Sequence, residues 1–158
     1  EILIGLVGSE MCIRDSPYTM PISDIYGLRQ AFDNIKNDPY MLERHAKIGN
    51  AVRAAVKEAG LELYQETGFS NTVTVFNVPE GTTDTAILTA MKEKCNIMLA
   101  GSFGAFAGKV IRIGHMGENA YPEKVGAVMA GLDLVFKDLG ITLKCSLKEA
   151  YDRKMSEQ

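Results

Sequence analysis

The sequence predicts a single α+β domain, in which helices cover one face of a small, mainly antiparallel sheet. Two observations lead to this fold class. Apolar residues recur every three or four positions over 25–35, 48–59 and 125–139, which is typical of amphipathic helices. Runs of branched apolar residues over 72–78 and 109–113 alternate between two faces, as strands do.

Composition limits the classes of protein that the chain can belong to. With 158 residues, it can form one domain that buries roughly 70% of the surface exposed by its unfolded chain. Apolar residues make up 46% and charged residues 23%, so neither disorder nor a membrane protein is expected. A net charge of -3 argues against nucleic acid as a partner. The three cysteines have no metal-binding or redox spacing, which favours a reduced, cytoplasmic location.

The first sixteen residues require separate treatment. They contain the run GSEMCIRDS, which resembles the translated frame of a transposase adapter used in preparing sequencing libraries. We therefore expect residues 1–16 to be a non-native leader and residues 17–158 to form the domain. The alternative is a genuine strand over residues 2–7 that is followed by a turn. This opening stretch is too short to span a bilayer.

Two helices are expected before the sheet. The first follows Pro21, with Ser23 or Asp24 as its cap, and ends at residues 37–39. Its apolar stripe consists of Ile25, Leu28, Phe32 and Ile35. The second helix covers residues 41–59 and ends at Gly60. Its expected buried side consists of Ile48, Val52, Ala55, Val56 and Ala59.

After Gly60 the periodicity changes to that of strands. We expect a short edge strand at 61–63, a central strand over 72–78, and a strand over 97–100. A helix capped by Thr82 or Thr83 should turn Ile87, Leu88 and Met91 toward the sheet. The clearest amphipathic helix begins at Pro122 and ends at Gly140. A short strand over 141–145 and a polar helix complete the expected elements.

Arg112 is the main candidate binding residue. In the predicted strand 109–113, Ile111 and Ile113 point to one face, whereas Val110 and Arg112 point to the other. A guanidinium is planar and matches a carboxylate or phosphate with two parallel hydrogen bonds, so its face should line an anion site. The alternative is an internal salt bridge to Asp or Glu.

The glycine-rich loop before this strand, with Gly101, Gly104 and Gly108, lets backbone approach another group closely. It does not have the pattern of a nucleotide-binding P-loop, because only three residues separate Gly104 from Gly108 and a strand follows. His115, just beyond the strand, could touch a ligand but is more typical of a loop hydrogen-bonding residue.

Two segments carry a family resemblance. The run GSFGAFAGKVIRIGHMGENAYPEKV resembles the C-terminal domain of class V pyridoxal-phosphate aminotransferases, in the branch of alanine-glyoxylate and serine-pyruvate aminotransferases. The run PYTMPISDIYGLRQAFDNI is similar to the beginning of the same domain. The resemblance covers most of the chain from Pro17 to Gly140, and it implies the small C-terminal domain of fold type I enzymes.

The resemblance also implies a function and individual site residues. Arg112 matches the arginine that binds the substrate carboxylate, and Thr19 matches a threonine that reaches the cofactor phosphate of a neighbouring subunit. The parent protein would be a homodimeric transaminase that moves an amino group from an alanine- or serine-type donor to a 2-oxo acid such as glyoxylate or pyruvate. Its cofactor would be pyridoxal 5'-phosphate.

This chain contains no lysine in the family's Schiff-base motif, so we expect it to be inactive alone. In the family, that lysine lies in the large domain. A second phosphate contact would fall at Ser16, where the adapter-like sequence joins, and Tyr18 would border the same pocket. The alternative function is a non-catalytic α+β regulatory domain in which Arg112 recognises a small anion.

Overall fold

A computed structural model describes residues 21–157 of the chain. The chain divides into two units, residues 1–39 and residues 40–158. The described part of the first unit is mainly helix α2, Ile22–Lys36. Pro21 precedes it without a side-chain cap, so the prediction of Ser23 or Asp24 as the cap is wrong. Asp24 lies instead in the first turn, where a negative charge favours the helix dipole.

The apolar stripe of α2 exists as predicted, but its members are not buried. Between 46% and 62% of each side chain is exposed in Ile25, Leu28, Phe32 and Ile35. The helix ends where the sequence indicated, with Asn37 as its C-cap before Pro39. The predicted boundary between a leader and the domain, at residues 16 and 17, lies outside the described residues.

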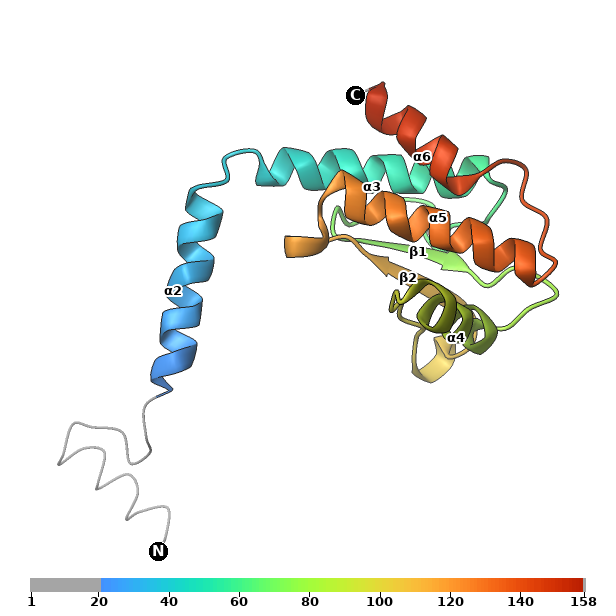
Figure 1. Cartoon of the computed structure of the whole chain (residues 1–158), viewed down its shortest axis with the longest axis horizontal. Helices are drawn as coiled ribbons and strands as arrows, with labels where there is room; N and C mark the ends of the chain where they lie inside the picture. The colour runs from blue at the N-terminus through green and yellow to red at the C-terminus, as the bar shows by residue number, and fades with distance from the viewer. Residues whose placement is uncertain (1–20, 158) are drawn as a thin grey trace, which may run out of the picture. The chain divides into compact units, whose positions relative to one another are not determined.

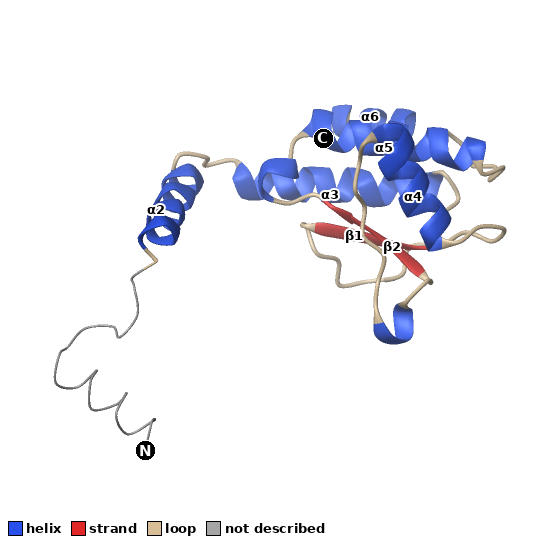
Figure 2. Cartoon of the chain, turned by 60° about the horizontal axis from the view of Figure 1, so that its bottom comes forward, coloured by secondary structure: helices blue, strands red, loops and turns tan. Residues whose placement is uncertain are grey.

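The second unit has the α+β fold class that the sequence predicts, and its α-helices lie on one side of a two-stranded sheet (Figures 1 and 2). Strand β1, Val73–Asn77, pairs antiparallel with β2, Val110–Gly114. In this register Val75 lies opposite Arg112. Phe76, Ile111 and Ile113 are almost fully buried on the side of the helices, as strand periodicity requires.

Helix α3, Met41–Glu58, and helix α5, Pro122–Asp138, supply much of the core. Each residue predicted for the buried side of α3 is at most 1% exposed. Gly60 follows α3 with a φ of 86°, a conformation that favours glycine. Helix α4, Asp84–Cys95, is capped by Thr83 and buries Ile87 and Met91, in agreement with the sequence.

Three predicted strands are reduced or absent in the described residues. Residues 61–63 provide a single bridge from Leu63 to Phe76, and residues 97–100 provide one from Ala100 to Arg112. The segment 141–145 forms no strand. Its backbone amides donate hydrogen bonds to helix ends instead. The Ile141 amide donates to the carbonyl of Phe136, and the Lys144 amide donates to the carbonyl of Ala59.

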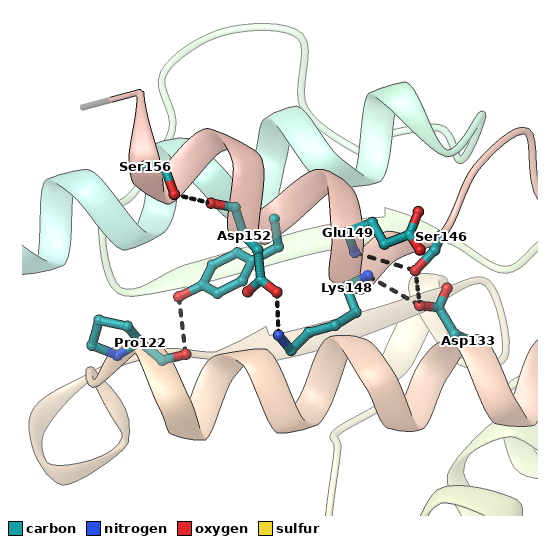
Figure 3. A network of polar contacts seen from close by, with 8 residues as sticks. Pro122, Asp133, Ser146, Lys148, Glu149, Asp152 and Ser156 are labelled. Carbon is teal, nitrogen blue, oxygen red and sulfur yellow. Dashed lines mark hydrogen bonds and ion pairs between the residues drawn. The ribbon is translucent and has the colours of Figure 1, made fainter.

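Helix α6, Leu147–Ser156, packs against α3 and α5. Asp133 of α5 caps its N-terminus by accepting a hydrogen bond from the Ser146 hydroxyl at 2.6 Å (Figure 3). It also accepts one from the Leu147 amide at 2.7 Å. The Lys148 amide donates a third bond at 3.0 Å. Leu147, Ala150 and Tyr151 are buried, so this largely polar helix is part of the core.

Candidate functional site

Arg112 lies on the sheet face that the helices leave open. Its neighbours along β2, Ile111 and Ile113, are at most 1% exposed, whereas the Arg112 side chain is only partly buried. The backbone of Arg112 is paired on the outer edge of β2, where its amide donates to the Ala100 carbonyl at 2.7 Å. The strand therefore fixes the base of this side chain, as the alternation in the sequence predicted.

The glycine-rich loop orients the guanidinium. The Nε atom of Arg112 donates to the carbonyl oxygen of Gly101 at 2.7 Å. A Cβ at position 101 would lie 3.3 Å from Oδ2 of Asp84 and 3.4 Å from Cδ1 of Leu88, so the loop packs tightly against α4 here. Glycine permits this approach, and the approach places the carbonyl that Arg112 uses.

The alternative of an internal salt bridge finds no support in residues 21–157. The ion pairs within this range join other residues, and none includes Arg112. The Nε atom has the only hydrogen bond that the described side chains and backbone give to the guanidinium. Both Nη groups thus remain available for an anion, in the planar geometry that a carboxylate requires.

Arg112 borders two hollows of different character. One is a pocket of about 270 Å³ on the open face of the sheet, with Val73, Val75 and Val110 as its floor. Its walls come from the segment before β1 and from the glycine-rich loop: Tyr64, Gln65, Gly68, Ser70, Ser102 and Phe106. The other is a groove of about 700 Å³ at the outer edge of β2, which includes Met98, Lys124 and Val128.

His115 has a different environment from Arg112. It is fully buried, and its Nε2 atom lies 2.9 Å from the hydroxyl oxygen of Thr74, which confirms its role as a hydrogen-bonding residue. Burial, together with the nearby charge of Arg53, lowers the pKa of His115 from 6.5 to about 4. The imidazole is thus neutral near pH 7, and it contributes to packing between β1 and the turn after β2.

Other predicted site residues lie outside the described part of the chain. These are Thr19, expected to contact a cofactor phosphate, and its neighbours Ser16 and Tyr18. Sequence reasoning missed Tyr64 and Phe106 as lining residues, because neither belongs to a periodic pattern. Only the position of Phe106 between Gly104 and Gly108 linked it to the Arg112 loop.

No group of His, Cys, Asp or Glu side chains in residues 21–157 could hold a metal ion. No helix in the same range is long and apolar enough to cross a membrane.

Comparison with known proteins identifies related sequences. No protein-family profile matches the chain. An uncharacterized aminotransferase of Methanocaldococcus jannaschii is 35% identical over 134 residues, which are 83% of this chain and 34% of the relative. The serine-glyoxylate aminotransferase of Arabidopsis thaliana is 37% identical over 128 residues, 78% of this chain and 32% of that protein. The chain thus spans about a third of the length of these curated relatives.

Solved structures agree in fold. The pyridoxamine-pyruvate aminotransferase of Mesorhizobium loti superposes with a TM-score of 0.82 at 28% identity, covering 90% of this chain and 38% of the other. For the alanine-glyoxylate aminotransferase of Nostoc sp. the TM-score is 0.72 at 28% identity, with 84% and 36% covered. The fold and the relatives are those of the class V aminotransferases. The chain belongs to this family and corresponds to its C-terminal domain.

Proposed function

We propose that this chain is the C-terminal part of a pyridoxal-phosphate-dependent aminotransferase. The parent enzyme would move an amino group from an alanine- or serine-type donor to a 2-oxo acid such as glyoxylate or pyruvate. The names of the relatives support this choice, because they include serine-glyoxylate and pyridoxamine-pyruvate aminotransferases. A homodimer remains a prediction that follows from the family resemblance, and a cytoplasmic location remains one that follows from the cysteine pattern.

The observation that carries the proposal is the orientation of Arg112. Its Nε atom is held by Gly101 while the Nη groups face no carboxylate of the described chain. In this role Arg112 binds the carboxylate of donor and acceptor in turn, since both substrates carry one. Charge-assisted hydrogen bonds of this kind contribute roughly 1.5–3 kcal/mol each.

The cofactor requires residues beyond those described. Pyridoxal phosphate, when bound, supplies the electron sink for removing a proton next to the amino group. Its attachment requires a lysine, and no lysine in residues 21–157 is buried in the way that an enclosed reactive lysine would be. The described residues therefore supply substrate binding, whereas Thr19 remains the predicted cofactor contact.

The test is substitution of Arg112 in a full-length enzyme that contains this domain. Arg112→Lys keeps the charge but loses the planar guanidinium with its paired donors, so kcat/KM for the amino donor should fall by about one to two orders of magnitude. Arg112→Ala should lower it further. The cofactor absorbance should not change, because Arg112 faces substrate. A normal donor KM in Arg112→Ala, or loss of the cofactor, would contradict the carboxylate role.

A further inference from the structure

Two aromatic rings close one side of the smaller pocket beside Arg112. The rings of Tyr64 and Phe106 make an edge-to-face contact with centroids 5.3 Å apart and planes at 73°. Tyr64 belongs to the segment before β1 and is tied to it by the hydrogen bond from its amide to the Val75 carbonyl. Phe106 belongs to η1, Gly104–Phe106, within the glycine-rich loop. The contact thus bridges the two segments that flank the open sheet face.

The pair is not part of the hydrophobic core. Tyr64 and Phe106 are each 45% exposed, and both line the pocket of about 270 Å³. Edge-to-face pairs gain about 0.5–1.5 kcal/mol beyond the burial of area, which favours contact between the two segments. A ring pair in this position limits how far a ligand can extend along the valine floor.

The charges of the pocket are equally restrictive. Arg112 is its only charged lining residue within the described chain, and the polar members Gln65, Ser70 and Ser102 are neutral. A second carboxylate on the ligand would thus lose its hydration without gaining a cation. A short uncharged substituent would instead lie on Val75 and Val110, where burial of apolar surface is favourable.

We propose that Tyr64 and Phe106 determine substrate size at the Arg112 site, which accepts a monocarboxylate with a short, uncharged substituent. This inference rests on the proposed function of Arg112, and it identifies the residues that select the substituent of the substrate. The groove at the outer edge of β2 is less suited to this task. Its Met98 is 81% exposed and flexible, so it cannot set a sharp limit on length.

The test uses the 158-residue chain and NMR titration with pyruvate, 2-oxohexanoate and 2-oxoglutarate. Binding is followed at the Nε–H resonance of Arg112 and at the Ser102 amide. Phe106→Ala and Tyr64→Ala each open the wall. Phe103→Ala is the matched control, because Phe103 lies in the same loop, is 79% exposed and does not line the pocket. Met98→Ala reports on the alternative groove.

In the unmodified chain, pyruvate should bind more tightly than either larger acid. Phe106→Ala and Tyr64→Ala should each shift the ratio of affinities toward 2-oxohexanoate by about tenfold, the effect of altered fit in an apolar pocket. Neither substitution should raise the affinity for 2-oxoglutarate, because neither adds a cation for its second carboxylate. Phe103→Ala should leave the ratio within about twofold, well inside the effect of a single lost methylene.

The outcomes separate the two proposals. If binding depends on Arg112 but the ratio is unchanged in Phe106→Ala and Tyr64→Ala, the size-selecting role is wrong and the function of Arg112 stands. A shift in Met98→Ala instead would assign selection to the outer groove. If the three acids cause no shift, or if Arg112→Ala leaves the Ser102 shifts intact, the carboxylate-binding role of Arg112 fails, and the inference with it.

Discussion

Arg112 and His115 are basic residues separated by two positions, yet the two faces of the sheet give them opposite roles. His115 is fully buried on the side of the helices, and Thr74 satisfies its Nε2 atom. Arg112 is partly exposed on the other face, and only its Nε atom is held, by a backbone carbonyl. Burial keeps the histidine neutral, whereas both Nη groups of the arginine have no hydrogen bond within the described residues.

The hydrogen-bond partners of these two basic side chains indicate their roles better than their positions in the sequence do. His115 lies closer in sequence to the end of β2, where loops often carry function. Its environment nevertheless stabilises the fold. We expect substitutions on the helix-covered face to change stability, and substitutions on the open face to change substrate binding.

The largest expected effect concerns chemistry on the open face. The chain alone should show no transaminase turnover, because binding a carboxylate does not replace an enclosed, reactive lysine. The measurement is to mix the chain with pyridoxal phosphate, reduce with borohydride and map the labelled peptides. We expect scattered labelling of surface lysines. One stoichiometric lysine adduct together with turnover would show that the open face is a complete active site.

The next effect belongs to the helix-covered face and depends on pH. Because the pKa of His115 is about 4 in the folded chain and 6.5 as a free side chain, the unfolded state binds more protons between these values. His115 thus contributes stability that is complete above about pH 6.5 and is lost as the pH falls toward about 4. The loss amounts to about 3 kcal/mol in the free energy of unfolding.

Urea denaturation across this pH range measures the effect of His115. In His115→Gln the pH dependence should be flatter than in the parent chain, since the titrating group is gone. Carboxylates that titrate below about pH 5 are common to both chains and cancel in the comparison. An identical pH dependence in the two would mean that His115 is not held neutral by its environment.

A smaller effect is expected where α6 joins the domain. Asp133→Ala removes three hydrogen bonds at the start of α6 and should lower the free energy of unfolding by about 1–3 kcal/mol. Asp138→Ala is the matched control on the same helix, because it breaks only an exposed ion pair with Lys94. Equal losses in the two variants would show that the cap does not anchor α6.

The smallest effect is expected at the leader. Removing residues 1–16 should change the free energy of unfolding by less than about 0.5 kcal/mol, within the range of surface changes. The shortened chain should still bind pyruvate, and its free energy of unfolding should keep the same pH dependence. A loss above roughly 2 kcal/mol would favour the alternative of a genuine strand over residues 2–7.

The sequence predicted the faces of the sheet well because alternation determines which residues are buried. Ile111 and Ile113 are core residues, and Arg112 is on the opposite face, as expected. It also predicted α3, α4 and α5, whose apolar periodicity and end signals agree. The apolar content of residues 141–145 was misleading, because their backbone amides complete helix ends instead of a ladder.

The candidate site was predictable only in its central residue. A charged residue between isoleucines is visible in the sequence, and so is the loop that precedes it. The pairing of Tyr64 with Phe106 depends on how two irregular segments meet over the sheet, and no periodic signal encodes such a contact. The Asp133 cap is equally invisible, because its partners belong to the following helix.

The most direct measurement compares Arg112→Ala with Thr74→Val in the same two assays, pyruvate binding at the Ser102 amide and unfolding by urea. Arg112→Ala should abolish binding and keep the free energy of unfolding within about 1 kcal/mol, since it removes no core contact. Thr74→Val should keep binding and cost about 1–2 kcal/mol, because His115 loses its partner. If pyruvate still binds to Arg112→Ala, or if Thr74→Val loses binding while its free energy of unfolding is unchanged, the assignment of the open face to substrate is contradicted.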